Sequence, residues 1–182
     1  KIQPQARELE EAVLGALMLE KDAYSLVSDI LKPESFYDNV HQIIYKAILS
    51  LAIRQAPIDM LTVVEELRKE GELEVVGGPV YIAQLTEKVA SAAHIEFHAR
   101  IIAQKYLARE LISFSSTVSN KAFDETSDVD DLMQEAEAKL FEISQRNVKK
   151  DFTQIDPVIK EALDLLDKAA SRSDGLSGLQ TG

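Results

Sequence analysis

The chain has 182 residues, of which 20 are lysine or arginine and 31 are aspartate or glutamate, giving a formal net charge of −11. This length suits one domain, or a domain of about 140 residues with a tail. The negative charge argues against binding of nucleic acid over the whole surface. The absence of cysteine excludes disulfides and thiolate metal sites and is typical of a reducing cytosol. No run approaches the roughly 18 apolar residues of a membrane span.

The negative charge is confined to residues 1–142, because residues 143–182 contain six basic and six acidic side chains. A polar stretch without periodicity, residues 144–151, follows this change in composition. The last residues, 171–182, are rich in glycine and serine, as linkers are. We therefore expect a boundary near residue 143.

The first part of the chain has helical periodicity. Pro4 is placed to occupy the first position of a helix, in which apolar residues recur at spacings of three and four. These residues are Leu9, Val13, Ala16 and Leu17. A short second helix is expected over 22–31, ending before Pro33.

Two aspartates predict the starts of the next helices. Asp38 is a good N-cap for a helix with apolar residues at Val40, Ile43, Ile44, Ala47, Ile48 and Leu51. Asp59 is expected to cap a helix that ends at Gly71. That helix is expected to bury Leu61, Val64 and Leu67.

The following residues also predict helices. Gly77 and Gly78 suit a tight turn, and Pro79 can open a helix that carries Ile82 and Leu85. From Ser91 to Phe123 no proline or glycine interrupts the chain, which predicts one helix on the order of 45 Å long. Residues 75–76 are too few to build a sheet, so the fold class is expected to be all-α.

A second long helix is expected after a polar turn over 124–128, with Thr126 or Ser127 as its N-cap. Two amphipathic helices joined by a short turn form an antiparallel αα-hairpin. Such a hairpin either projects as an oligomerisation element or folds back on its own bundle, and the spacing does not decide between them. The seam is expected to consist of Leu107, Leu111, Phe114, Val118, Leu132, Met133, Leu140 and Ile143.

A last helix is expected over 157–171, capped by Asp156 and opened by Pro157. At about 15 residues it would be marginal alone in water. Polar linkers flank it on both sides, which favours docking on a partner surface over packing on its own domain. The docking residues are expected to be Ile159, Leu163 and Leu166.

The sequence contains no phosphate-binding loop of the GxxxxGK[ST] kind and no GxSxG. His94 and His98 are four residues apart, which is a metal-ligand spacing, but no third ligand is evident. We therefore expect no metal site, although a metal-dependent hydrolase stays the alternative from the enzyme class. The residues themselves predict a non-catalytic helical module that ends in a linker.

Several segments in this order resemble the N-terminal region of the bacterial replicative DNA helicases of the DnaB family. Each segment alone is weak, but together they cover essentially the whole chain. They are the opening helix with Glu10-x-x-Val13-Leu14-Gly15, Phe36-Tyr37 with His41-Gln-Ile-Ile-Tyr45, Pro57-Ile-Asp59, Gly77-Gly78 with Tyr81-Ile82, Phe97-His-Ala-Arg-Ile-Ile102 with Arg109 and Leu111-Ile112, and Gly175-Leu-Ser-Gly-Leu-Gln-Thr-Gly182. The last match is looser, because the family usually has proline where Gln180 stands.

The resemblance implies an architecture of three parts: an N-terminal helical bundle over 1–100, a helical hairpin for dimerisation over 101–146, and a linker region over 147–182 with the linker helix 157–171. Six such domains would associate as a trimer of dimers and form a collar, while the linker helix would dock on the ATPase domain of a neighbouring subunit. A RecA-like ATPase domain would follow residue 182, so the chain is expected to be a fragment that lacks the ATPase site.

The resemblance also implies what the full-length protein does. It would be a cytoplasmic hexameric helicase that uses ATP and Mg²⁺ for 5′→3′ unwinding at the replication fork, with single-stranded DNA held mainly by the motor domain. The collar would bind primase, with contacts at Tyr81, Ile112 and Val118, and a helicase loader is a further expected partner. Val118 is also assigned to the hairpin seam, and Tyr81 also suits a core position after the glycine turn.

A further alternative is the helicase-binding domain of a primase, which shares the combination of bundle and hairpin. That domain lies at the end of its own protein. The expected linker helix and the glycine-rich segment over 157–182 favour a motor domain downstream instead.

Overall fold

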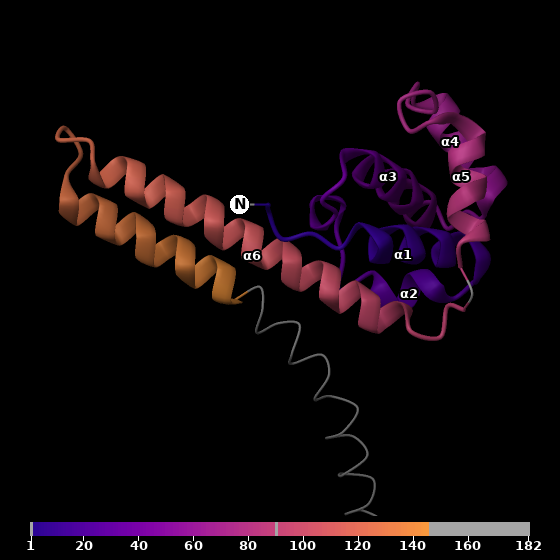
Figure 1. Cartoon of the computed structure of the whole chain (residues 1–182), viewed down its shortest axis with the longest axis horizontal. Coiled ribbons are helices and arrows are strands. Elements are labelled where there is room, and N and C mark those ends of the chain that lie inside the picture. The colour runs from indigo at the N-terminus through magenta and orange to yellow at the C-terminus, as the bar shows by residue number, and fades with distance from the viewer. Residues whose placement is uncertain (1, 90, 146–182) are drawn as a thin grey trace, which may run out of the picture. The chain divides into compact units, whose positions relative to one another are not determined.

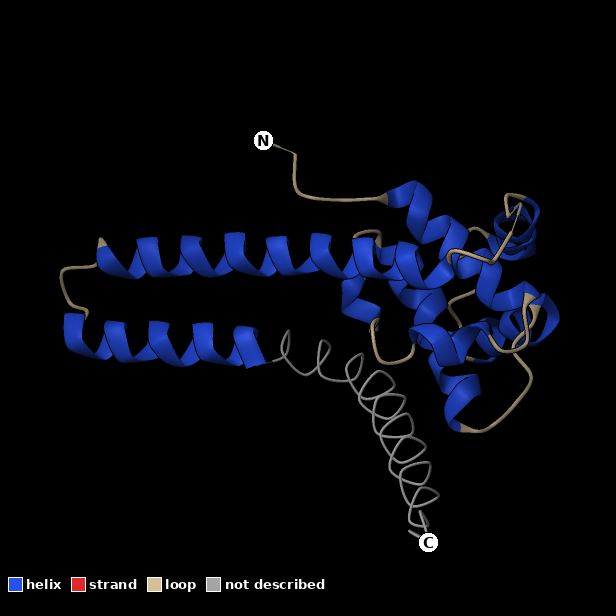
Figure 2. Cartoon of the chain, turned by 90° about the horizontal axis from the view of Figure 1, so that it is seen from below, coloured by secondary structure: helices blue, strands red, loops and turns tan. Residues whose placement is uncertain are grey.

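The computed structural model describes residues 2–89 and 91–145, and these residues form helices joined by short loops (Figure 2). No strand occurs among them, so the all-α prediction is confirmed for the part of the chain that is described. The chain divides into two units, residues 1–127 and residues 128–182, which are treated separately below. The predicted linker helix over 157–171 lies outside the described residues.

The first unit is a bundle from which one long helix extends (Figure 1). The first α-helix lies at its centre and packs against the fifth and the sixth, while the third packs against the fourth and against a 3₁₀ turn. The elements are α1 (Arg7–Leu19), α2 (Ala23–Val27), the 3₁₀ helix η1 (Pro33–Ser35), α3 (Asn39–Ile53), α4 (Met60–Lys69), α5 (Gly78–Glu87) and α6 (Ile95–Ala122). With these labels, the central helix α1 packs against α5 and α6.

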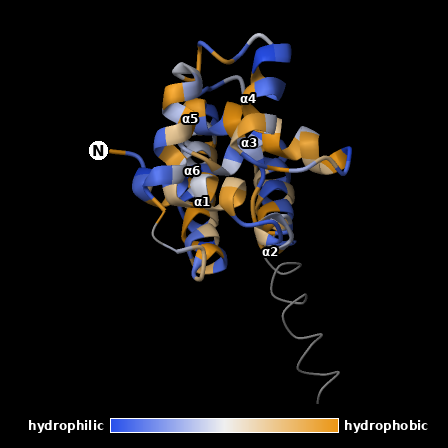
Figure 3. Ribbon diagram, turned by 90° about the vertical axis from the view of Figure 1, so that its right-hand side faces the viewer, coloured by the Kyte–Doolittle hydropathy of each residue, from blue (hydrophilic) through white to orange (hydrophobic). Residues whose placement is uncertain are grey.

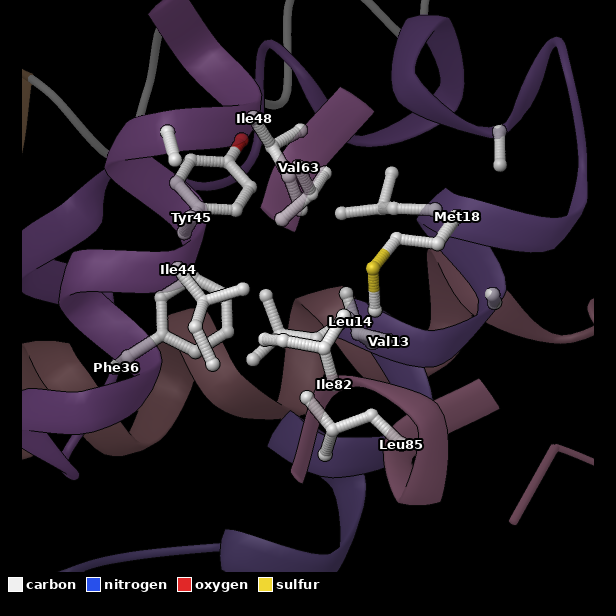
Figure 4. Close-up of a cluster of buried hydrophobic side chains, with 14 of the residues drawn as sticks. Val13, Leu14, Met18, Phe36, Ile44, Tyr45, Ile48, Val63, Ile82 and Leu85 are labelled. Atoms are coloured by element: carbon white, nitrogen blue, oxygen red, sulfur yellow. The ribbon is translucent and has the colours of Figure 1, made fainter. Parts of the chain in front are cut away.

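The hydrophobic core lies where α1, α3 and α5 meet (Figure 4). Leu14 of α1, Ile44 of α3 and Ile82 of α5 are completely buried there. The rings of Phe36 and Tyr45 pack with their centroids 4.9 Å apart. Hydrophobic and hydrophilic residues are interleaved along the helices of the bundle (Figure 3). This is the pattern expected of amphipathic helices that each bury one face.

The two aspartate caps predicted for the bundle are confirmed. The Asp38 carboxylate accepts from the Val40 N–H, and the Asp59 carboxylate accepts from the N–H groups of Leu61 and Thr62. Both bonds satisfy backbone donors that have no partner inside the helix. Gly71 ends α4 with a φ of 76°, a conformation that costs glycine little.

Gly15 of α1 lies where α1 and α5 approach each other closely. A Cβ atom at this position would lie 2.1 Å from the carbonyl oxygen of Leu85 in α5, and 2.5 Å from a methyl group of Val89. Only glycine lets the two backbones come this close. Glycine is therefore needed at position 15, the end of the motif Glu10-x-x-Val13-Leu14-Gly15, because of helix packing and not because of its backbone conformation.

Three predicted helix starts or ends were wrong. Helix α1 begins at Arg7, so Pro4 lies in the extended segment before it. Helix α2 ends at Val27, four residues before the predicted end. Helix α6 begins at Ile95 and not at Ser91, because the Ser91 hydroxyl accepts from the Ala93 N–H and forms a turn in place of a helical start.

The predicted burial of Leu61 was also wrong, since 70% of this residue is exposed. The apolar face of α4 is centred on Val63 and Leu67, which are completely buried. Leu61 is at the edge of that face, in the first turn of the helix.

In the second unit, residues 129–145 form the predicted helix. Its N-cap is Asp128, whose carboxylate accepts from the N–H groups of Asp130 and Asp131. The prediction of Thr126 or Ser127 as the cap was wrong. The N–H and hydroxyl of Thr126 instead donate to Asp124, which closes the turn before the helix.

Candidate functional site

Helix α6 carries the first group of predicted interface residues, and all of them except Leu107 lie on its outer half, from Leu111 to Ala122. The inner half is packed in the bundle, where Ile95, Ala99 and Ile102 are buried. By contrast, 39% of Leu111 and 47% of Ile112 are exposed. The other predicted residues on this helix are half-buried: Leu107, Phe114 and Val118. The helix thus presents apolar side chains beyond the region where the bundle buries them.

The second group of predicted interface residues belongs to the helix over 129–145. Met133 and Leu140 are more than one-third exposed, and so are their neighbours Val129 and Phe141. The same helix also holds the predicted seam residues Leu132 and Ile143. Their role in self-association stays a prediction.

The predicted primase contacts come from two different helices. Ile112 and Val118 lie on the outer half of α6, whereas Tyr81 lies on α5 and is half-buried against the core. Burial raises the pKa of Tyr81 to about 12, so its hydroxyl keeps its proton at neutral pH. The predicted docking residues of the linker helix, Ile159, Leu163 and Leu166, lie outside the described residues.

A buried chain of hydrogen bonds joins α1, α3 and α5. Glu10 and His41 are each only 1% exposed, and the Glu10 Oε2 atom lies 2.7 Å from the His41 Nδ1 atom. The His41 Nε2 atom lies 2.8 Å from the Tyr81 hydroxyl. Because a carboxylate only accepts, we assign the ring proton to Nδ1, which leaves Nε2 to accept from Tyr81.

The same carboxylate also organises the loop before α3. The Tyr37 N–H donates to Glu10 Oε1 over 2.6 Å, and the Asp38 N–H approaches Oε2 at 3.4 Å. Glu10 therefore accepts from the backbone as well as from His41. This supplies the partners that a buried acidic group needs.

Asp38 links this loop to the N-terminal turn of α1 through an ion pair with Arg7. Partial burial opposes ionisation of Asp38, but hydrogen bonds from Arg7 and from the Val40 N–H outweigh it. The pKa of Asp38 is therefore lowered from its usual range. The carboxylate thus serves as a helix cap and as an ion-pair partner at once.

The described residues contain no group of three or more His, Asp or Glu side chains that could hold a metal. The rings of His94 and His98 lie 6.5 Å apart, and His94 precedes α6 rather than lying within it. No helix among the described residues is long and apolar enough to cross a membrane.

Sequence reasoning assigned no role to Glu10, His41 or Arg109, although all three occur in the motifs quoted above. The signal for Glu10 was available, because an acidic residue falls beside Val13 and Leu14 on the apolar face of an amphipathic helix. An acidic residue in that position requires a buried partner. Its partner is 31 positions away, and the spacing of the residues could not identify it.

Comparison with known protein families assigns more than half of the chain to the family that its sequence resembles. The family model of the DnaB-like helicase N terminal domain matches residues 2–104. The chain belongs to this family. The resemblance seen in the sequence is thereby confirmed.

Relatives and solved structures agree with this assignment. The chain is 42% identical over 182 residues to the replicative DNA helicase DnaB of Rhodothermus marinus, and 36% identical to the replicative DNA helicase DnaC of Bacillus subtilis. All of this chain is matched in both cases, but it spans only 19% and 40% of the two relatives.

The N-terminal domain of DnaB helicase from Mycobacterium tuberculosis has a similar structure, with a TM-score of 0.73 and 36% identity. The match covers 78% of this chain and 99% of that domain. A structure of a DnaB-like replicative helicase and its interactions with primase gives a TM-score of 0.64 at 25% identity, covering 76% of this chain and 31% of that one.

Proposed function

We propose that this chain is the N-terminal collar domain of a hexameric, ATP-dependent replicative DNA helicase that unwinds DNA 5′→3′ at the replication fork. Family membership and relatives that are replicative DNA helicases support this proposal. The sequence has no phosphate-binding loop, so ATP and Mg²⁺ would bind to a motor domain elsewhere in the protein. Single-stranded DNA would be held mainly by that domain, and the protein would act in the cytoplasm.

Within the helicase, the chain would mediate self-assembly through α6 and the helix over 129–145. The observation that carries this proposal is the change along α6 from buried to exposed apolar residues. Ile102 is 1% exposed, whereas Leu111, nine residues later, is 39% exposed. A row of apolar side chains beyond the bundle is the kind of surface that a second copy can cover.

The collar would also receive primase. A neighbour of similar structure is a DnaB-like helicase described with its interactions with primase, which supports this partner. The residues we propose for the contact are Tyr81, Ile112 and Val118. A helicase loader is a further partner, and the linker helix would dock through Ile159, Leu163 and Leu166 on the motor domain of a neighbouring subunit.

Replacement of one exposed leucine tests the self-assembly function. Leu111→Asp places a charge in the proposed interface, where it would be buried without a partner. We expect the dissociation constant for self-association, measured by sedimentation equilibrium, to rise at least tenfold. Thermal unfolding of the bundle should stay within the range of surface substitutions, because Leu111 is not part of the core.

The matched control is Asn120→Asp, which adds the same charge to an exposed position of the same helix. Nine residues correspond to about two and a half helical turns, so Asn120 lies on the opposite side of α6 from Leu111. Self-association of this control should equal that of the wild type. A wild-type chain that remains monomeric at high micromolar concentration, or equal weakening by both variants, would overturn the proposal.

A further inference from the structure

Arg109 lies at the point where α6 leaves the bundle. The last buried residue of the helix is Ile102, and the first exposed large apolar residue beyond it is Leu111. Arg109 lies between them, seven residues beyond Ile102. Its side chain bonds to two other segments of the first unit.

The guanidinium of Arg109 joins three segments that are far apart in the sequence. Its Nη1 donates to the carbonyl oxygen of Pro4 over 2.8 Å, and its Nη2 donates to the carbonyl oxygen of Ser35 over 2.7 Å. The guanidinium carbon also lies 5.6 Å from the ring centroids of Tyr37 and Tyr106. The segment before α1, the end of η1 and the middle of α6 thus meet at one side chain.

The planar shape of arginine is needed for this arrangement. Two N–H groups of one guanidinium reach two carbonyl oxygens while its carbon lies 5.6 Å from two aromatic ring centroids, which the point charge of lysine cannot reproduce. Burial lowers the pKa of Arg109, while the nearby Glu10 carboxylate opposes this change. The guanidinium remains charged at neutral pH, and bonds from a charged donor are stronger than neutral ones.

Arg109 supplies a hydrogen bond to the segment before α1. Gln5, next to Pro4, has a side-chain oxygen that is buried and accepts no hydrogen bond within the described residues. A buried acceptor without a partner opposes the docking of this segment. The bond from Arg109 to the Pro4 carbonyl is a contact that offsets that cost.

Small rotations of α6 have large effects at its end. The distance from Ile102 to Ala122 along the helix is about 30 Å at 1.5 Å per residue, and Arg109 lies about 10 Å along it. If the helix tilted by about 10° about a pivot at Ile102, its outer end would move by roughly 5 Å. A restraint at Arg109 therefore controls where the outer apolar residues lie relative to the bundle.

We propose that Arg109 is a positioning residue for self-assembly, which fixes the direction of the outer half of α6 by joining it to the segment before α1 and to η1. This inference rests on the proposed function, because it assigns a second copy of the chain as the partner of that half. In this proposal Arg109 acts through the helix and not by contact with the second copy. By fixing the direction of the helix, it determines where Leu111 and its neighbours lie relative to the bundle.

Two separate measurements test the direction of α6 and the strength of self-association. The chain has no cysteine, so spin labels can be attached at two introduced sites, Lys46→Cys on α3 and Asn120→Cys on α6. Both positions are exposed. Distances between the labels are measured by pulsed electron paramagnetic resonance, with an excess of unlabelled protein so that only distances within one chain contribute.

We expect a narrow distance distribution in the otherwise unchanged chain and one at least twice as wide after Arg109→Met. Arg109→Lys should give an intermediate width, because lysine can reach one carbonyl but not both. The control is Arg100→Met, which removes a charge from the opposite side of the same helix, where Arg100 pairs with Glu96. Its distribution should stay narrow. A contribution to stability alone would not widen the distribution well below the unfolding temperature.

Sedimentation of the unlabelled variants completes the test. Arg109→Met should raise the dissociation constant of self-association at least tenfold, and Arg100→Met should leave it unchanged. An unchanged distance distribution in both Arg109 variants would overturn the positioning role. A wider distribution with unchanged association would overturn its link to assembly. Failure of the proposed function itself would instead appear as a wild-type chain that does not associate.

Discussion

The inner bundle and the outer half of α6 differ in how far their apolar side chains are buried. In the bundle, Leu14, Ile44 and Ile82 are completely buried, and Glu10 and His41 pair with each other. On the outer half of α6, leucine and isoleucine side chains are exposed. The two regions share one continuous helix, so the difference arises from the surroundings of the side chains and not from the secondary structure.

We interpret this difference as two roles, a packed core in the bundle and a surface for a partner on the outer half of α6. The bundle buries a large apolar core and pairs the buried Glu10 with His41, as a unit that folds without a partner must. The bundle does not cover the exposed apolar side chains on the outer half of α6, and we propose that a second copy of the chain covers them. Substitutions within the bundle test how much its own contacts contribute to its stability.

The largest expected effect is the loss of the buried carboxylate. Glu10→Ala leaves the His41 ring and the Tyr37 N–H without their acceptor inside the bundle. We expect the free energy of unfolding to fall by about 3–5 kcal/mol, as measured by urea denaturation. The neighbouring substitution Glu11→Ala removes only a surface pair with Lys88 and should cost less than about 1 kcal/mol. Equal losses would contradict the account of the buried network.

The next largest effect concerns the contact between α1 and α5. Gly15→Ala should raise stability by up to about 1 kcal/mol if the site were open, because alanine favours helix more than glycine does. The close approach of Leu85 and Val89 predicts the opposite sign, a loss of about 1–3 kcal/mol from overpacking. Urea denaturation of the two proteins decides between the signs, and a stabilised variant would show that the helices are not closely packed.

A smaller effect is expected from the charge of Asp38. Its pKa is lowered in the folded chain, so its contribution to stability is present above the unfolded value of about 3.9 and is lost as the pH falls through the folded value. Asp38→Asn keeps a helix cap but removes the charge. At pH 7 the variant should be less stable by at most about 1 kcal/mol.

The pH profile separates this charge effect from a simple loss of structure. The wild type should lose more of its unfolding free energy than Asp38→Asn when the pH is lowered from about 5 to about 2. Thermal unfolding at several pH values gives both profiles. Parallel profiles would mean that Asp38 contributes only as a cap.

Local rules predicted much of the bundle. Asp38 and Asp59 were identified as caps because their side chains satisfy N–H groups only a few residues away. Gly71 was identified as a helix end for a similar local reason. Such contacts are visible in the sequence because both partners are close together along the chain.

Contacts between distant segments could not be predicted in this way. The bond from Arg109 to the Pro4 carbonyl spans 105 positions, and the bond from Tyr81 to His41 spans 40. Burial of one face also depends on the neighbouring helices, which is why Leu61 was misplaced. The resemblance to the helicase family pointed to the residues of the buried network, but it did not explain what they contact.

The most direct test of the account measures hydrogen exchange of the wild-type chain at low and at high protein concentration. The account predicts that amides of the outer half of α6, beyond Leu111, exchange more slowly at high concentration, because a second copy covers that half. Amides of α1, α3 and α5 should exchange at the same rate at both concentrations. An outer half whose exchange does not depend on concentration, or a bundle whose protection does, would contradict the account.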